Sequence, residues 1–281
     1  MLRPATEADR DRVLAIARAE DLAWFGEPQF TLEEMGEFLD HIGGMASGSV
    51  AVDAQGRVRG FAGVGAVHES LLVVDPSDAD PPYADLIDWI RDHGAASLNA
   101  YSNDAPRLAA LEKAGWRHAF SNFELARPGA GPVEQPRWPA GVTVAPFARP
   151  RDDERVHHLI YVDARWADVA GHHERPFEAW RDMIGPEEKG WVATRGDHVV
   201  GVAIGRVFAD GRAWIHQLAV AHDERGNGIG RALLLHAYAA LLVTGATSLG
   251  LDVQANNDNA LGLYRSVGLE ITREWRIYQP V

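Results

Sequence analysis

The sequence contains no cysteine among its 281 residues. This absence excludes disulfides, thiolate metal ligands and a cysteine nucleophile. It also fits a cytoplasmic location, which we expect for this chain. Histidine does not suggest a metal site either. Its two doublets, His157–His158 and His172–His173, are adjacent pairs, and adjacent side chains rarely point at one ion. We therefore expect no metal site.

Long apolar runs are also absent. A membrane-spanning helix needs about 20 mostly apolar residues, and the richest stretch, residues 232–243, is interrupted by His236 and Tyr238. Residues 1–7 contain no apolar segment, so we expect no signal peptide. These features predict a protein that does not enter a membrane.

Positive charge is scarce, because 27 Lys and Arg face 40 Asp and Glu, giving a formal net charge of −13. This balance argues against broad contact with a phosphate backbone, so we expect no nucleic-acid partner. An anionic ligand would need a local site that works against the field of the whole chain.

The length is about twice that of a usual domain, which predicts two domains. Proline and glycine are dense in residues 127–141 and disfavour both helix and strand. We therefore expect domains at residues 1–127 and 142–281, joined by a linker at residues 128–141.

The two halves show the same order of patterns. Each ends in a strand, a helix, a glycine turn and a further strand, with Gly115 and Gly268 at matching places, 268 − 115 = 153 residues apart. A tandem duplication is the simplest account, and two unrelated α/β domains are the alternative. The mixed order of elements predicts an α/β or α+β sheet flanked by helices in each half. Hairpins are expected at residues 49–53 with 57–64, and at residues 190–194 with 199–207.

A strand, a glycine-rich turn and a helix follow one another at residues 213–220, 225–230 and 231–243. Glycines let the backbone approach a ligand, and successive N–H groups at a helix N-terminus attract an anion. Arg225 and Arg231 would add full positive charges beside the turn. This arrangement predicts a phosphate or pyrophosphate site.

The spacing of the glycines narrows the choice of ligand. The dinucleotide pattern G-x-G-x-x-G fails, because its third glycine would fall at Arg231 or Leu233. The phosphate-loop pattern is absent as well. The sequence instead reads R-x-x-G-x-G, from Arg225 through Gly228 and Gly230.

A second pattern, N-x-x-A-x-x-L-Y-x-x-x-G, follows at Asn257, Ala260, Tyr264 and Gly268. Together, the two patterns resemble the GNAT superfamily of GCN5-related N-acetyltransferases over about residues 212–270. The resemblance implies two tandem domains, each with a mixed, mostly antiparallel sheet. It also implies an enzyme that uses acetyl-CoA, or another short acyl-CoA, as cosubstrate. The acyl group would pass to an amine.

The resemblance also assigns the cofactor contacts. One strand would meet the pantetheine arm, the turn would bind the pyrophosphate, and the second pattern would line the other side. The residues concerned are Leu218, Ala219, Val220, Arg225, Gly226, Asn227, Gly228, Ile229, Gly230, Arg231, Asn257 and Ala260.

Tyr264 would face the thioester sulfur and act as the acid for the leaving thiolate, although a core tyrosine is the alternative. His216 would serve as the base, since the strand resembles that of arylalkylamine N-acetyltransferases. Those enzymes carry a second histidine where this chain has Trp214, and no carboxylate lies between residues 213 and 220. A structural histidine bonded to the backbone is the alternative for His216. Without cysteine, we expect direct transfer within a ternary complex.

Residues 166–180 are rich in aromatic and histidine side chains, and in this fold such a segment covers the acceptor site. We expect substrate contacts from Trp166, His172, Phe177 and Trp180, with core packing as the alternative for the aromatics. The acceptor would be a small-molecule amine, bound by a monomer or a homodimer.

The first half lacks the turn. Residues 75–82 carry three aspartates and three prolines but no glycine or arginine. At the offset of 153 residues, Tyr264 corresponds to Leu111 and Ala260 to Arg107. We therefore expect a degenerate domain without an acyl-CoA site, a plan that tandem proteins such as mycothiol synthase share.

Three other functions remain open on the sequence alone. The first is an enzyme like mycothiol synthase, and the second is a protein or peptide N-acetyltransferase. The third is a non-catalytic sensor that binds acyl-CoA, which the missing strand carboxylate would suit.

Overall fold

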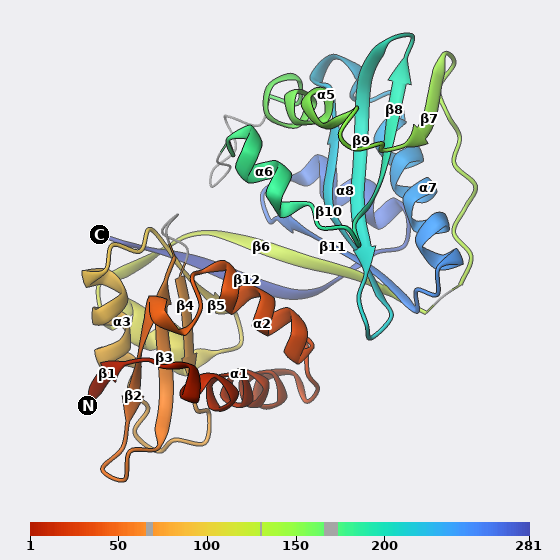
Figure 1. Cartoon of the computed structure of the whole chain (residues 1–281). Coiled ribbons are helices and arrows are strands. Elements are labelled where there is room, and N and C mark those ends of the chain that lie inside the picture. The colour runs from red at the N-terminus through yellow and green to blue at the C-terminus, as the bar shows by residue number, and fades with distance from the viewer. Residues whose placement is uncertain (66–69, 130, 166–173) are drawn as a thin grey trace. The chain divides into compact units, whose positions relative to one another are not determined.

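The computed structural model describes residues 1–65, 70–129, 131–165 and 174–281, and they divide into two compact units (Figure 1). One unit contains Met1–Asn122 together with Glu274–Val281, and the other contains Phe123–Arg273. The expected division at residues 1–127 and 142–281 differs from this in two ways. Residues 128–141 group with the second unit, and the last residues of the chain group with the first.

The first half of the chain folds into an ordered series of short elements. They are β1 (Leu2–Pro4), η1 (Glu7–Asp9), α1 (Arg10–Phe25), α2 (Leu32–His41), η2 (Met45–Ser47), β2 (Gly48–Val52), β3 (Val58–Val64), β4 (Ser70–Val74), α3 (Tyr83–Asp92), β5 (Leu98–Tyr101), α4 (Ala105–Lys113) and β6 (Trp116–Pro128).

Strands β1 to β4 form an antiparallel sheet in chain order. Neighbouring residues on these strands point to opposite faces. Phe61 and Val73 therefore pack with α1 and α2 on one side, while Ala62 and Val74 pack with α3 on the other. The last strand of the chain completes this unit, since Trp275 to Tyr278 pair antiparallel with β5. That pairing explains why the final residues group with the first unit.

The second half contains a second series. They are β7 (Val142–Pro146), α5 (Asp153–His158), η3 (Leu159–Asp163), α6 (Phe177–Met183), β8 (Lys189–Arg195), β9 (His198–Val207), β10 (Arg212–Val220), η4 (His222–Glu224), α7 (Ile229–Val243), β11 (Ser248–Gln254), α8 (Asp258–Ser266) and β12 (Glu270–Pro280).

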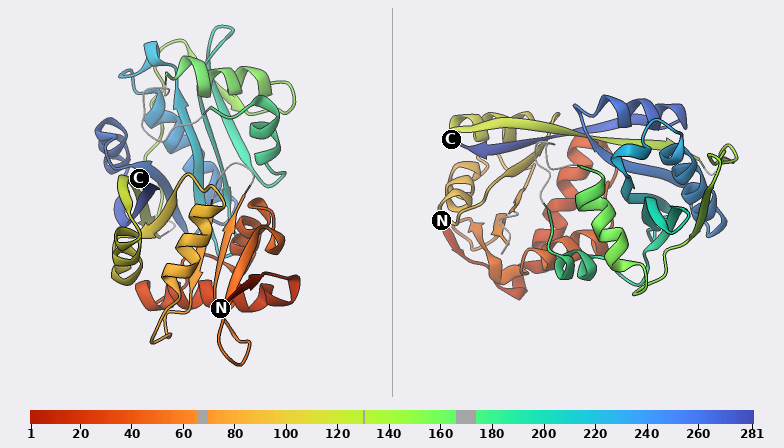
Figure 2. Two further views of the ribbon diagram at one scale, coloured as in Figure 1. Left: turned by 90° about the vertical axis from the view of Figure 1, so that its left-hand side faces the viewer. Right: turned by 90° about the horizontal axis from the view of Figure 1, so that it is seen from above.

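The sheet of the second unit has the order β12-β6-β11-β10-β9-β8-β7, to which β12 contributes its first residues. Strands β7, β8, β9 and β10 pair antiparallel with one another, whereas β10 and β11 pair parallel. Helices α5 and α6 cover one face of this sheet, and α7 and α8 lie on the other (Figures 1 and 2). The mixed, mostly antiparallel sheet flanked by helices is the fold class that the sequence predicted.

Both predicted hairpins are confirmed, as β2–β3 and β8–β9. Helices α4 and α8 lie at the predicted offset, since 258 − 105 and 266 − 113 both equal 153. Each begins with the same cap, in which Asp104 Oδ1 accepts from the Arg107 N–H and Asn257 Oδ1 accepts from the Ala260 N–H, both at 3.1 Å. This repeated detail supports a tandem duplication. In the described parts of the chain, no helix has the length and apolarity needed to cross a membrane.

Candidate active site

Strands β10 and β11 separate in the middle of the second unit. Their parallel pairing runs from Arg212↔Ser248 to Ile215↔Leu251, while β10 stays paired with β9 as far as Val220↔Gly201. Beyond Ile215, the edge of β10 that faced β11 is therefore open to an extended ligand. Leu218, Ala219 and Val220, the predicted pantetheine contacts, lie on this part of the strand.

A β-bulge marks the point of separation. Ile215 pairs with Gly205 and Gln217 pairs with Ile204, so His216 is the extra residue on β10. Bulges re-aim side chains and end strand pairing, and they often lie beside active sites. The bulge thus places His216 at the mouth of the opening between β10 and β11.

The glycine turn at the end of β10 has the backbone form that an anion site requires. Gly226 and Gly228 have φ values of +79° and +85°, and Gly228 is the N-cap of α7. An added Cβ would meet nothing within 4 Å at either position, so only the backbone conformation demands glycine. Among the hydrogen bonds of the described residues, none has a main-chain N–H of residues 226–231 as its donor. The turn therefore presents a run of unpaired N–H groups at a helix N-terminus.

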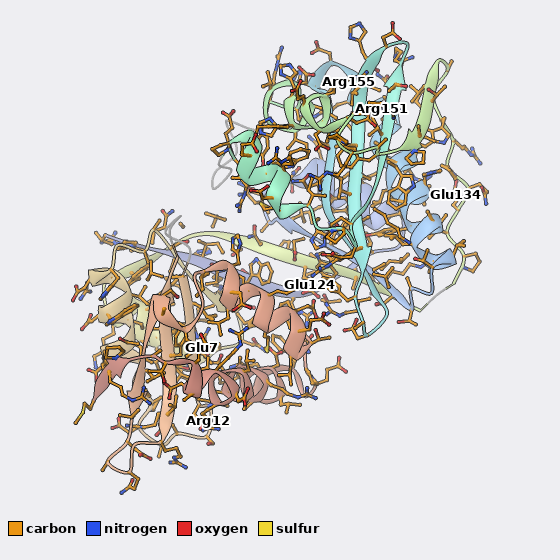
Figure 3. All side chains as sticks on the ribbon, in the orientation of Figure 1. Glu7, Arg12, Glu124, Glu134, Arg151 and Arg155 are labelled. Carbon is orange, nitrogen blue, oxygen red and sulfur yellow. The ribbon has the colours of Figure 1, made fainter. Side chains whose placement is uncertain are left out.

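The two arginines of the turn bind to protein groups. Arg225 donates to the carbonyls of Val220, at 3.3 Å, and of Ala164. Arg231 pairs with Glu134 at 2.8 Å, on the extended segment beside α7 (Figure 3). Both guanidinium groups thus hold the turn in place, and the amide groups remain as the donors available to an anion.

Asn257 and Ala260 are brought to the start of α8, where the Asn257 side chain caps the helix. Ala260 is half-buried against the core that α7 forms with the sheet. The first and fourth residues of the N-x-x-A pattern therefore serve the helix cap and the packing of α8.

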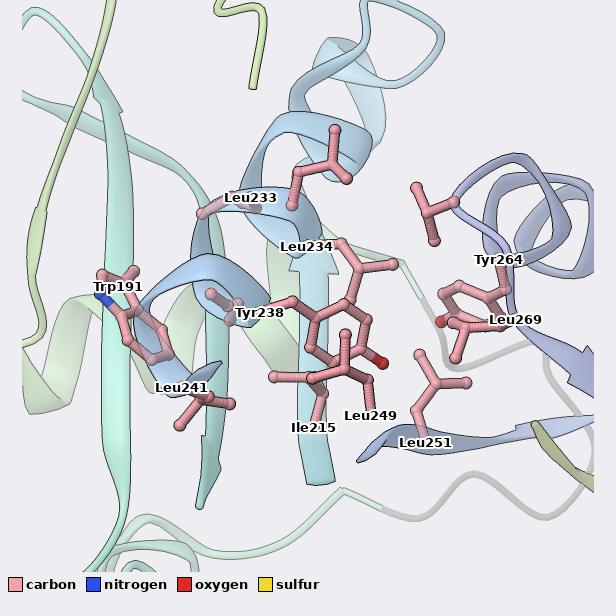
Figure 4. Close-up of a cluster of buried hydrophobic side chains, with 14 of the residues drawn as sticks. Trp191, Ile215, Leu233, Leu234, Tyr238, Leu241, Leu249, Leu251, Tyr264 and Leu269 are labelled. Atoms are coloured by element: carbon pink, nitrogen blue, oxygen red, sulfur yellow. The ribbon is translucent and has the colours of Figure 1, made fainter. Parts of the chain in front are cut away.

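Tyr264 on α8 is 7% exposed and lies among apolar residues of α7, β11 and β12. Its hydroxyl points toward Tyr238, whose own hydroxyl donates to the Gly250 carbonyl at 3.1 Å (Figure 4). No hydrogen bond of the described residues involves the Tyr264 hydroxyl. Burial raises the pKa of Tyr264 to about 12, so the phenol keeps its proton throughout the neutral range.

His216 lies near a carboxylate. Its Nε2 is 3.4 Å from Glu188 Oε1, and its ring meets Phe208 edge-on. Burial and the Arg206 guanidinium lower the pKa of His216 to about 4, although Glu187 opposes this. The imidazole is therefore neutral at pH 7 and is a weak base. Among the described residues, no hydrogen bond joins it to the backbone, which was its alternative role.

The predicted acceptor residues are not all brought together. Trp180 is fully buried in the core under α5 and α6, and its indole N–H donates to Gln217 Oε1 on β10 at 3.1 Å. Phe177 packs beside it and is half-buried. The core-packing alternative therefore describes Trp180, because its ring has no surface left for a substrate. Trp166 and His172 lie outside the described residues.

A carboxylate that the sequence analysis passed over lies at the same opening. Asp252 on β11 follows Leu251, the last residue paired with β10, and its side chain is exposed. The only signal in the sequence was one acidic residue within the apolar stretch 248–253. In the described parts of the chain, no group of histidine and acidic residues is arranged to hold a metal.

An open hollow of about 520 Å³ lies elsewhere on this unit, lined by polar residues such as His158, Asp163 and His198. It reaches Ala221, immediately before the turn, but it includes neither Tyr264 nor His216. We therefore do not assign it to the chemistry.

In the first unit, the position that matches Ala260 holds a buried ion pair. Arg107 is 8% exposed, contacts Glu20 on α1 and lies 3.0 Å from Asp104. Glu20 also accepts from the Val74 N–H, at the end of β4, at 3.1 Å. Strand β4 precedes the turn-like segment in this unit as β10 does in the other, so these side chains fill the space beside its end.

Comparison with known proteins agrees with this geometry. Residues 154–269 match the acetyltransferase (GNAT) family. The mycothiol acetyltransferase of Thermobispora bispora is 27% identical over 198 residues, which are 65% of this chain and 65% of that protein. The chain thus spans slightly less than two thirds of that relative's length.

Two solved structures share the fold over almost the whole chain. A GCN5-related N-acetyltransferase from Sphaerobacter thermophilus has a TM-score of 0.80 at 22% identity, covering 99% of this chain and 94% of its own. A tandem GNAT protein from the clavulanic acid biosynthesis pathway has a TM-score of 0.71 at 15% identity, covering 99% and 98%. Residues 154–269 thus form an acetyltransferase domain of the GNAT family, in a chain that has the tandem GNAT fold.

Proposed function

We propose that the second unit transfers an acetyl group directly from acetyl-CoA to the amine of a small molecule. The observation that carries this proposal is the run of unpaired N–H groups over residues 226–231, next to the open edge of β10. Pyrophosphate fits the first feature, because oxyanions bind N–H groups at a helix N-terminus. An extended pantetheine amide chain fits the second, because it can hydrogen-bond to a strand edge.

The first unit would not bind acetyl-CoA. The segment after β4 has no glycine turn, and Arg107, Glu20 and Asp104 occupy the place beside it. One cofactor site in each chain follows from this. The first unit would then support the fold or help to hold the acceptor.

Calorimetry with acetyl-CoA and the intact chain tests the cofactor, and we expect one site per chain. Release of coenzyme A is then measured with a panel of amines. The panel contains small alkyl and aryl amines, the desacetyl form of mycothiol and peptides with free N-termini. Acceptor-dependent release separates an enzyme from a non-catalytic sensor, and the preferred acceptor separates the substrate classes. Absence of acetyl-CoA binding would overturn the proposal.

The turn itself gives a first prediction. A non-glycine residue in the left-handed region costs about 1–2 kcal/mol, so Gly228→Ala disfavours the conformation that presents the amides. We expect the Kd for acetyl-CoA to rise by about fivefold to thirtyfold, by the usual conversion of about 1.4 kcal/mol per tenfold. Calorimetry on the variant measures the change.

Gly196 offers a matched control, because it has φ +56° in the β8–β9 turn, and an added Cβ would meet nothing within 4 Å there too. Gly196→Ala should bring comparable strain and leave the Kd for acetyl-CoA unchanged. Equal affinity in both variants would show that the turn does not bind the cofactor.

A further inference from the structure

Gln217 is the residue of β10 whose direction the β-bulge changes. Ile215 lies in the core that contains α7, and residues two apart on a regular strand share a face. Because His216 is the extra residue at the bulge, Gln217 instead points to the opposite face, which α5 and α6 cover (Figure 1). Ala219 follows on this face, in the core of Trp180. The Gln217 side chain thus lies under α6, which begins in the expected acceptor segment, residues 166–180.

The orientation of the Gln217 side-chain amide is set by Trp180. The indole N–H of Trp180 donates to Gln217 Oε1 at 3.1 Å. An indole nitrogen can only donate, so the amide must turn its oxygen toward the ring and its NH2 group away. The ring is fully buried among side chains of α5, β8 and β9, which keep it in place. Any effect of Trp180 on a substrate must therefore pass through Gln217.

The NH2 group of Gln217 has no partner in the described parts of the chain. Among their hydrogen bonds, the Gln217 side chain accepts one from Trp180 and donates none. The residue is half-buried, and its amide nitrogen is not one of the fully covered polar atoms that lack a partner. The two N–H groups therefore remain reachable, and a ligand that accepts from them satisfies donors that the protein leaves unpaired.

The surroundings favour a neutral oxygen as the partner of this NH2 group. Phe177 is half-buried beside Trp180, so the neighbouring surface is aromatic. A carboxylate is bound best by a guanidinium group. Arg206, which lies near His216, already pairs with Glu187 at 2.9 Å. A neutral amide donor beside an aromatic ring therefore suits a carbonyl oxygen better than a carboxylate.

The cofactor and this NH2 group would use different sides of β10. The open edge of the strand beyond Ile215 lies in the plane of the sheet, and the proposed function places the pantetheine chain and the acetyl group there. The Gln217 side chain leaves the strand out of that plane. A molecule bound by Gln217 therefore reaches the acetyl group from the face of the sheet, as an acceptor would. Because Gln217 directly precedes Leu218, a predicted pantetheine contact, the recognised oxygen must lie close to the reacting amine.

We infer that the NH2 group of Gln217 recognises the acceptor by donating to a neutral carbonyl oxygen next to the reacting amine. The preferred acceptors are then α-amino amides, in which the carbonyl carbon is attached to the carbon that carries the amine. The inference rests on the proposed function and names its substrate class. Trp180 is a positioning residue, since it fixes the amide of Gln217 and has no surface of its own for the acceptor.

The test compares two amines in the coenzyme A release assay. Alaninamide carries the carbonyl group, and sec-butylamine has the same skeleton without it. Both are supplied at equal concentrations of the unprotonated amine, because an α-amino group has a pKa of about 8 and an alkyl amine one of about 10. We expect the wild-type kcat/KM to be about tenfold to hundredfold higher for alaninamide, the usual effect of one hydrogen bond to an otherwise unpaired polar group.

Gln217→Glu removes the donor and keeps the rest of the side chain. Glutamate retains the size of glutamine and an oxygen for the Trp180 N–H but has no N–H of its own. We expect kcat/KM for alaninamide to fall by about tenfold to hundredfold, through KM. The kcat/KM for sec-butylamine and the Kd for acetyl-CoA should stay unchanged. Gln217→Met removes the donor without adding a charge and should give the same pattern.

A matched control separates the donor from the added charge. Gln55→Glu makes the same change in the exposed turn between β2 and β3, and it should alter neither amine's kcat/KM. Trp180→Phe removes the indole N–H and lets the Gln217 amide turn either end toward the acceptor. The preference for alaninamide should then fall by about twofold to tenfold. If Trp180→Phe does not fold, the two variants at Gln217 still decide the matter.

The outcomes that contradict the inference differ from those that contradict the proposed function. An unchanged preference in Gln217→Glu, or an equal loss for both amines, would overturn the role of Gln217. A wild-type chain that prefers sec-butylamine would overturn the substrate class. Absence of acetyl-CoA binding would refute the proposed function itself. A peptide that begins with alanine carries the same group as alaninamide, and the ratio of their kcat/KM values distinguishes a peptide acceptor from a small molecule.

Discussion

Tyr264→Phe is expected to lower kcat by about 10²–10³-fold, the usual effect of removing one donor to a developing negative charge. The pKa of about 12 makes complete proton transfer to a thiolate unfavourable, because a thiol has a pKa of about 8.5. The phenol would instead stabilise the leaving sulfur by donating a hydrogen bond. Steady-state coenzyme A release measures kcat, and calorimetry should show nearly unchanged acetyl-CoA affinity.

Tyr238 is a suitable control, since it is also a buried tyrosine whose hydroxyl lies in the same cluster (Figure 4). Tyr238→Phe removes the bond to the Gly250 carbonyl, worth about 1 kcal/mol of stability, and should leave kcat unchanged. Because the phenol of Tyr264 keeps its proton up to about pH 12, no alkaline loss of kcat should arise from it below pH 10. Equal kcat in Tyr264→Phe and wild type would exclude the donor role.

Arg107→Ala is expected to lower the free energy of unfolding by about 3–5 kcal/mol, the usual cost of removing one partner from a buried ion pair. Glu20 and Asp104 would remain buried without their cation. Burial raises the pKa of Glu20 to about 7 even with Arg107 present. Removal of the Arg107 guanidinium would raise the pKa of Glu20 further. The carboxylate would then be protonated at pH 5, so the loss of stability should be smaller at pH 5 than at pH 8. Urea denaturation at the two pH values measures both effects.

The same substitution at Arg57 provides the control. Arg57 pairs with Asp53 at 3.1 Å, but its side chain is 72% exposed. Exposed pairs contribute about 0–1 kcal/mol, so Arg57→Ala should be almost neutral at either pH. A loss below 1 kcal/mol in Arg107→Ala would show that the buried network does not stabilise the first unit.

The sequence predicted the fold and the turn well, because both depend on local rules. The glycines at 226 and 228 predict a left-handed turn before a helix, and the structure has this turn, with φ values of +79° and +85°. The same holds for the matching caps at Asp104 and Asn257, which set the repeat of 153 residues.

The features of the site that the sequence did not predict depend on strand pairing and on the packing of helices against the sheet. The approach of Asp252 to Trp214 requires the register of β11 against β10, and the orientation of His216 requires the bulge at Ile215 and Gln217. Burial of Trp180 depends on the packing of α6 against the sheet. None of these long-range relations appears in the spacing of residues along the chain.

The last strand makes the two repeats interdependent during synthesis. Strand β6 ends among the residues of the second unit, and β12 ends among those of the first. The repeats have thus exchanged their final strand segments, as in a domain swap within one polypeptide. Strand β5 lacks its partner until Trp275 to Tyr278 have left the ribosome, so the first repeat is completed only after the second has been made. A chain cut at residue 127 would lose that partner strand, and neither repeat can be isolated by a single break.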